Sequence, residues 1–207
     1  MKIICYGDSN TFGYRPDGRG RYDVHTRWPG ALGELLGEGY EVVEEGLCGR
    51  TTAFEDVTEA GRCGLDQIQE AVKRSGPLDL LIVMLGSNDC KIQFHASAEQ
   101  ITEGLEQVVR KAGAHAGKAF DVLLIAPAAL TEQVIRGGFG SEFDQRSIMV
   151  SRELARTYEE LAERLSCGFL DGSRAAAVST IDGLHLDAGA HGGLAEAVCE
   201  WVKSHGA

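Results

Sequence analysis

The side chains best suited to chemistry in this sequence are Ser9, Asp182 and His185, which lie in the short polar segments GDSN and DGLH. A serine hydroxyl becomes a nucleophile when a base removes its proton, and imidazole, whose ordinary pKa is about 6.5, can do so at neutral pH. A carboxylate that accepts the other ring N–H holds the imidazole in the required tautomer. The residue types therefore predict a serine hydrolase in which Ser9 attacks, His185 is the base and Asp182 orients it.

Acyl chemistry of this kind also needs hydrogen-bond donors for the negative oxygen of the tetrahedral intermediate. The candidates are the backbone N–H of Ser9, the backbone N–H of Gly49 in GLCGR, and the side-chain amide of Asn88 in GSND. A glycine lets the backbone approach a ligand closely, and loss of one donor typically lowers the rate by about 10²- to 10³-fold. Together they are predicted to form an oxyanion hole.

Each of these residues also has a purely structural interpretation. Ser9 could cap a following helix, Asn88 could form a turn, and Asp182 and His185 could lie on a surface loop. The choice depends on whether the segments meet in space, and therefore on the helices and strands around them.

Apolar runs recur at wide intervals along the chain and are typical of buried strands. They occupy residues 3–6, 42–43, 80–85, 122–126 and 169–170. Between and after these runs, helical spacing of apolar residues predicts amphipathic helices in residues 28–36, 65–72, 101–112, 154–165 and 194–202.

The predicted helices carry suitable end signals. Pro29 suits the first turn of the earliest helix and Gly37 suits its end. Ser97 and Gln100 have the spacing of a capping box before the helix over 101–112. Asp187 is a candidate cap for the last helix.

Strands that alternate with helices predict parallel βαβ units with helices on both faces of one sheet. We expect an α/β fold, a three-layer α/β/α sandwich around a mostly five-stranded parallel sheet, as one domain over residues 1–207. In such a sheet the ligand site lies beyond the carboxyl ends of the strands, where the polar segments should meet. Residues 127–151 are the least periodic and are expected to form a long loop or a broken helix.

Four segments together resemble the sequence blocks of the SGNH, or GDSL-type, hydrolases. They are GDSN at residues 7–10, EEGLCGRTT at 44–52, MLGSND at 84–89 and DGLH at 182–185, which carry Ser, Gly, Asn and His in the family order. Together with EEGLCGRTT, the segment RWPG at residues 27–30 looks like the small cytoplasmic aryl- and acyl-esterase branch. The resemblance covers nearly the whole chain.

The resemblance implies a flavodoxin-like SGNH fold and an esterase that works through an acyl-enzyme on Ser9, with acyl transfer to alcohols in some members. By similarity, His185 is the base and Asp182 its orienting acid, and the Ser9 amide, Gly49 and Asn88 form the oxyanion hole. No cofactor and no metal is implied. The relatives are commonly oligomeric, so a homo-oligomer is expected.

The substrate pocket is predicted to include Asn10, Phe12 and Trp28, with Tyr14 as a further aromatic candidate. Asn10 also departs from the common GDSL form, which has leucine after the nucleophile. Packing and hydrogen bonding beside Ser9 are therefore expected to differ from that form.

Several alternatives remain open on the sequence alone. Short acyl or aryl esters are the expected small-molecule substrates, and acetylated sugars are the rival substrates of the same chemistry. Cys48 or Cys90 could supply a thiol nucleophile instead of the serine. A non-catalytic, flavodoxin-like binding module is disfavoured because neither of the common Gly-rich phosphate-loop motifs is present.

Charge and hydropathy exclude other classes of partner. The chain has 20 Lys and Arg against 31 Asp and Glu, a formal net charge of −11. Such a surface repels nucleic-acid phosphates and disfavours strongly anionic substrates, which leaves neutral esters. The N-terminus lacks the apolar region of a signal peptide, and no apolar run approaches the roughly 20 residues of a membrane span. We expect no nucleic-acid partner, no membrane insertion and a cytoplasmic location.

Overall fold

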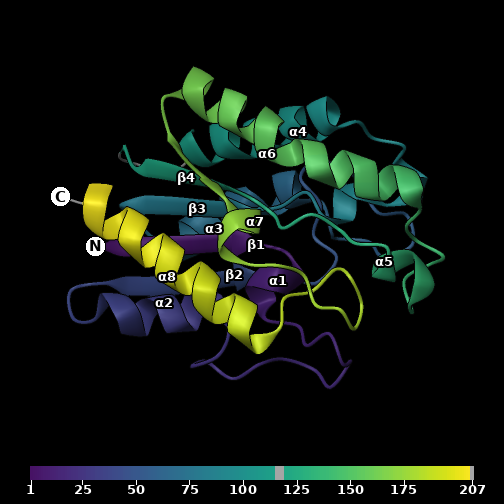
Figure 1. Ribbon diagram of the computed structural model, residues 1–207. Coiled ribbons are helices and arrows are strands. Elements are labelled where there is room, and N and C mark those ends of the chain that lie inside the picture. The colour runs from purple at the N-terminus through teal and green to yellow at the C-terminus, as the bar shows by residue number, and fades with distance from the viewer. Residues whose placement is uncertain (115–118, 206–207) are drawn as a thin grey trace.

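A parallel sheet forms the middle layer of the computed structural model, which describes residues 1–114 and 119–205 (Figure 1). Within these residues the strand order is β2-β1-β3-β4-β5, and every neighbouring pair is parallel. The strands are β1 (Lys2–Gly7), β2 (Glu41–Gly46), β3 (Leu80–Met84), β4 (Asp121–Ala126) and β5 (Gly168–Asp171). Each contains one of the predicted apolar runs or most of it, and the predicted sheet is confirmed.

Helices cover both faces of this sheet (Figure 1). One face carries α3 (Gly64–Ser75), α4 (Ala98–Gly113) and α6 (Gln145–Leu165), and the other carries α2 (Trp28–Leu36) and α8 (Ala188–His205). The short helices are α1 (Ser9–Phe12), η1 (Asn88–Cys90), η2 (Ile92–Phe94), α5 (Gln133–Arg136) and α7 (Gly172–Ala175). This is the predicted α/β/α sandwich. No helix in the described part of the chain is both long and apolar enough to span a bilayer.

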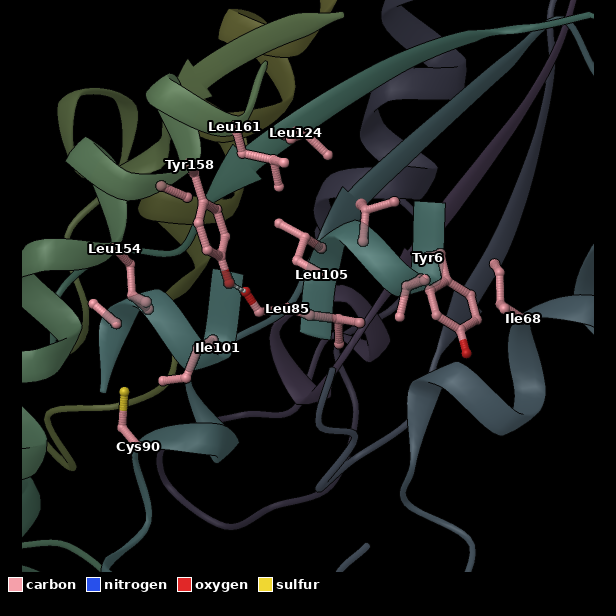
Figure 2. Close-up of a cluster of buried hydrophobic side chains, with 14 of the residues drawn as sticks. Tyr6, Ile68, Leu85, Cys90, Ile101, Leu105, Leu124, Leu154, Tyr158 and Leu161 are labelled. Atoms are coloured by element: carbon pink, nitrogen blue, oxygen red, sulfur yellow. Dashed lines mark hydrogen bonds between the residues drawn. The ribbon is translucent and has the colours of Figure 1, made fainter. Parts of the chain in front are cut away.

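Two apolar clusters, one on each face of the sheet, hold the layers together. All five residues of β3 are buried, as expected for a central strand with helices on both faces. In the cluster under α4 and α6, Tyr158 points its ring between the helices, and its hydroxyl donates to the Leu85 carbonyl at 2.9 Å (Figure 2). Leu85 directly follows β3, so this bond links α6 to the edge of the sheet where the polar segments begin.

The helix ends follow the expected chemistry where a capping residue is present. The Ser97 hydroxyl accepts from the Gln100 amide, and the Gln100 side chain accepts from the Ser97 amide, which confirms the capping box of α4. Asp187 accepts from the amide of Ala190 in the first turn of α8 at 2.9 Å. Both caps satisfy N–H groups that have no partner within the helix.

The stretch over residues 127–151 is partly helical, so of the two expected forms it is closer to the broken helix than to the long loop. It contains α5, and α6 begins at Gln145, well before the first apolar residue of the predicted stripe. Asp144 caps α6 through a box with Ser147. The first turn of α6 is polar, so apolar spacing does not reveal it.

Truncation of Leu105 on α4 should destabilise the fold. Its side chain is fully buried in the cluster of Figure 2, so Leu105→Ala should lower the free energy of unfolding by about 2 to 5 kcal/mol in urea titrations. Leu35, which is 43% exposed on α2, is the matched control, and Leu35→Ala should cost about 0.5 kcal/mol or less. Equal losses in the two variants would contradict the assignment of this core.

Candidate active site

The polar segments meet where the strand order reverses. β1 has β2 on one side and β3 on the other, so a crevice opens at the carboxyl ends of these neighbouring strands. Ser9 follows β1, Gly49 follows β2 and Asn88 follows β3. Figure 1 shows α1 and α5 at this end of the molecule, opposite the N-terminus and the end of α8.

Hydrogen bonds join Ser9, His185 and Asp182 in a line. His185 Nε2 lies 2.9 Å from Ser9 Oγ, and His185 Nδ1 lies 2.6 Å from Asp182 Oδ2. With Nδ1 protonated, the ring donates to the carboxylate and Nε2 is free to accept the serine proton. The other oxygen of Asp182 accepts from the amides of Leu184 and His185, both at 3.0 Å, which holds the carboxylate in place. The structure thus brings the three predicted residues into the geometry that general-base activation of a serine requires.

The predicted oxyanion donors all belong to residues that line one cavity. Ser9 is the first residue of α1, so its N–H has no intrahelical partner. Gly49 lines the cavity with φ at +79°, a conformation that side chains rarely adopt, and an added Cβ would lie 3.0 Å from Glu59 Oε2. Asn88 Nδ2 donates to the Arg50 carbonyl at 3.1 Å, which leaves its second N–H for a ligand.

Buried side chains tie the Gly49 and Asn88 segments together. Asp89 Oδ1 accepts from both the amide of Thr52, at 2.9 Å, and its hydroxyl, at 2.5 Å. Arg50 donates to the carbonyls of Gly7, at 2.8 Å, and Glu45, at the ends of β1 and β2. These bonds hold the segments of Gly49 and Asn88 together and attach them to the end of β1, which Ser9 follows.

Asn10 acts as a clamp on the loop that carries His185. Its Nδ2 donates to the Leu184 carbonyl at 3.2 Å, and its Oδ1 accepts from the Leu186 amide at 2.9 Å. Asn10 is only 4% exposed, so both bonds are shielded from water. The residue after the proposed nucleophile therefore holds the backbone on both sides of the proposed base, which a leucine at this position could not do.

The pocket prediction is wrong for Asn10, Phe12 and Trp28, none of which lines the cavity around Ser9. Asn10 turns toward the His185 loop instead, and Trp28 is fully buried in the core under α2 and α8. The Phe12 ring lies under the Arg21 guanidinium, 4.4 Å from it. Aromatic residues near a sheet edge pack where the local backbone directs them, and sequence distance from Ser9 does not give that direction.

A cavity of about 470 Å³ opens above Ser9 and His185. Its apolar wall includes Tyr14, as anticipated, together with Phe139 and Phe143 from the segment between α5 and α6. The Tyr14 and Phe139 rings flank the imidazole of His185 at centroid distances of 4.6 and 5.6 Å. Thr58, Glu59, Lys91 and Glu142 add a polar wall.

The cavity wall contains residues from two loops that were not predicted from the sequence. The 127–151 region supplies Phe139, Glu142 and Phe143, but the loop after Thr52 also contributes Thr58 and Glu59. The polar and apolar walls of the cavity therefore include residues from two loops that lie far apart in the sequence. The one signal in the sequence that could have indicated a wall residue was closeness to a polar segment, since Lys91 lies three residues after Asn88.

The cysteines differ in their access to the site. Cys90 is 4% exposed inside the apolar cluster of Figure 2, and burial, followed by the nearby Asp89, raises the pKa of its thiol well above the ordinary value. Cys48 lines the cavity, and burial raises the pKa of its thiol as well. Neither environment favours the thiolate that a cysteine nucleophile needs.

Possible metal ligands gather away from this cavity. Ligand atoms of Glu55, Cys63 and Asp66 lie within 4.8 Å of one another, but none of these residues lines the cavity of Ser9. The proposed chemistry at Ser9 requires no metal.

In this α/β/α sandwich, Ser, Gly and Asn follow three parallel strands, and an Asp/His pair lies just before the last helix. This order is the architecture of an SGNH-type hydrolase. The family model of the GDSL-like lipase/acylhydrolases matches residues 5–193, and the chain belongs to this family. It is a carboxylic ester hydrolase. No curated protein matches the chain.

Solved structures agree with this assignment. The native aryl esterase of M. smegmatis is 31% identical, with a TM-score of 0.92 over 99% of both chains. A carbohydrate acetylesterase family member from Sinorhizobium meliloti is 35% identical, with a TM-score of 0.93 over 99% of this chain and 98% of its own. A lipolytic G-D-S-L family protein from Veillonella parvula, at 16% identity, has a TM-score of 0.69 over 97% of each chain and shows the shared fold.

Replacement of Asn10 by the leucine of the common form should impair turnover. Asn10→Leu removes both bonds to the His185 loop, so kcat for p-nitrophenyl acetate should fall by about 10- to 100-fold with little change in KM. Thr11→Val is the matched control, because Thr11 Oγ1 is buried with no hydrogen-bond partner among the described residues. Unchanged kcat in Asn10→Leu would show that the clamp does not position His185.

The buried carboxyls beside the site should make stability depend on pH. Burial raises the pKa of both Asp8 and Asp89 to about 6. Because the folded chain holds these protons more tightly than the unfolded chain, their contribution to stability is complete below the unfolded pKa of about 4 and is lost as the pH rises through about 6. Asp89→Asn should reduce this fall in unfolding free energy, measured by urea titration at several pH values.

The control for this effect is Asp121→Asn, which changes an exposed aspartate at the start of β4. Its pH dependence should match that of the unmodified chain. A stability profile in Asp89→Asn that also matches the unmodified chain would exclude Asp89 as a source of the effect.

Proposed function

We propose that the chain is a serine esterase that hydrolyses short acyl or aryl esters through an acyl-enzyme on Ser9. The observation that carries this proposal is the hydrogen-bonded line from Ser9 through His185 to Asp182, at 2.9 and 2.6 Å, beside a cavity large enough for a small ester. The GDSL-like family match supports the same reaction class.

Acylation begins with the Ser9 hydroxyl. His185 Nε2 takes its proton as Oγ attacks the ester carbonyl, and the Asp182 carboxylate stabilises the imidazolium that forms. The carbonyl oxygen becomes negative and accepts hydrogen bonds from the Ser9 and Gly49 amides and from the free N–H of Asn88. His185 then gives its proton to the leaving alcohol oxygen, the carbon–oxygen bond breaks, and the acyl group stays on Ser9.

Deacylation repeats these steps with a new nucleophile. Water enters where the alcohol left, His185 takes its proton, and the acid departs as Ser9 regains its hydrogen. A second alcohol in place of water would receive the acyl group. The Tyr14 and Phe139 rings beside His185 limit the space for water around the base, which supports acyl transfer as a side reaction.

Deacetylation of sugars is the second candidate function. Its support is the similar carbohydrate acetylesterase family member from Sinorhizobium meliloti, together with the polar wall of Thr58, Glu59, Lys91 and Glu142. The aryl esterase of M. smegmatis and the aromatic wall support aryl esters. Parallel assays of p-nitrophenyl acetate and acetylated xylose separate the two functions through kcat/KM.

Removal of the proposed nucleophile should abolish the activity. Ser9→Ala and His185→Ala should each lower kcat for p-nitrophenyl acetate by about 10⁴-fold or more, since the residues act as a unit. Ser173→Ala, on the exposed start of α7, is the control and should retain full turnover.

A serine-directed phosphonate provides a second measurement. Mass spectrometry of the labelled chain should find the adduct on the peptide that contains Ser9. Turnover that survives in Ser9→Ala, or an adduct on Cys48, would rule out this mechanism.

A further inference from the structure

Lys91 is a buried cation in the wall of the active-site cavity. The residue is 7% exposed, and it lines the cavity that also contains Ser9 and His185. Its Nζ lies 2.7 Å from Glu142 Oε2 and 3.4 Å from Asp56 Oδ2. The reaction proposed above gives Lys91 no proton to move and no charge to stabilise.

The two carboxylates belong to the two loops that form the polar wall. Asp56 is fully buried and accepts from the Thr58 amide at 2.9 Å and from the Thr58 hydroxyl at 2.6 Å. Burial raises the pKa of Asp56, but these bonds and the Lys91 charge outweigh it and hold the pKa of this carboxyl below its ordinary value. The ionised Asp56 thus fastens the loop that carries Thr58 to Lys91.

Glu142 fastens the opposite segment. It lies between α5 and α6, next to Phe143 in the cavity wall, and its carbonyl accepts from the Ile92 amide at 2.8 Å. Its side chain is 41% exposed, so the Glu142 end of the ion pair with Lys91 reaches solvent. Lys91 therefore joins both loops across one wall of the cavity.

The direction of the acyl group follows from the mechanism. The leaving oxygen must lie near His185 Nε2, beside the rings of Tyr14 and Phe139. The acyl arm takes a different direction from both the leaving oxygen and the oxyanion at the tetrahedral carbon. Lys91 lines the same cavity, and its amide donates to the carbonyl of Asn88 at 3.1 Å, so it directly follows the turn that carries one of the proposed oxyanion donors.

We propose that the acyl arm points toward the wall formed by Lys91 with Asp56 and Glu142, and that this wall restricts the enzyme to short acyl chains. The proposal rests on the esterase function proposed above and names the residue that sets its substrate range. A longer acyl chain would have to bury methylene groups against the buried ion pair of Lys91 and Asp56. Against an apolar wall, each added methylene would strengthen binding by about fourfold. Against this ion pair, the longer chain would lose that gain.

The test compares chain lengths within one enzyme. The measured quantity is the ratio of kcat/KM for p-nitrophenyl hexanoate to that for p-nitrophenyl acetate. Lys91→Met keeps a long side chain but removes the charge, and it should raise this ratio by about 10-fold or more, chiefly through a lower KM for hexanoate. Lys73→Met, which breaks an exposed ion pair on α3, is the control and should leave the ratio unchanged.

A double variant guards against a folding defect. Lys91→Met leaves Asp56 buried without its cation, whereas Asp56→Asn with Lys91→Met removes both charges and keeps an oxygen that can accept from Thr58. The double variant should raise the ratio as much as the single one.

The outcomes separate the two proposals. An unmodified chain that hydrolyses acetate, with a ratio unchanged in both Lys91 variants, overturns the role of Lys91 and leaves the esterase intact. An unmodified chain that hydrolyses no ester overturns the esterase proposal, and the Lys91 role falls with it. A ratio that already favours hexanoate in the unmodified chain also overturns the Lys91 role.

Discussion

The hydrogen bond between His185 and Ser9 is the contact on which the rest of the site depends, because it joins residues 176 positions apart in the sequence. Local bonds shape the loop around His185, and the bonds from Asn10 to the backbone on either side of it attach that loop to the first helix after β1. The sheet then brings the Gly49 and Asn88 segments to the same crevice. The proposed nucleophile, base and oxyanion donors are thus positioned mostly by backbone and buried polar contacts, which tolerate little displacement.

Much of the architecture could be predicted because buried strands and helices carry apolar residues at a regular spacing in the sequence. The apolar runs and helical stripes identified the strands of the sheet and its long helices, and the Ser97 capping box marked the start of α4 correctly. The meeting of the polar segments followed from topology, since carboxyl ends of parallel strands share one edge. Ser9, Asp182 and His185 could be grouped before any distance was known, although their catalytic roles stay a prediction.

The residues of the cavity walls could not be predicted because they follow no regular spacing in the sequence. Trp28 and Phe12 had the right residue type but point into packing contacts, whereas Phe139 comes from a segment with a polar and glycine-rich sequence. The role of Asn10 depends on two backbone groups of a distant loop, and that of Lys91 on carboxylates from two different loops. Such pairings become visible only when the folded chain brings the segments together.

The rings of Tyr14 and Phe139 beside His185 also bear on the charge that the imidazole carries during the reaction. In the proposed reaction the imidazole becomes a cation when it takes the serine proton, and both aromatic centroids lie within the 6 Å at which an aromatic quadrupole attracts a cation over its face. Such contacts are worth about 0.5 to 2 kcal/mol each, depending on how far water is excluded. This attraction would exist only while the imidazolium exists, so in the proposed mechanism the rings favour the tetrahedral intermediate over the resting enzyme and stabilise a transient charge without adding a permanent one.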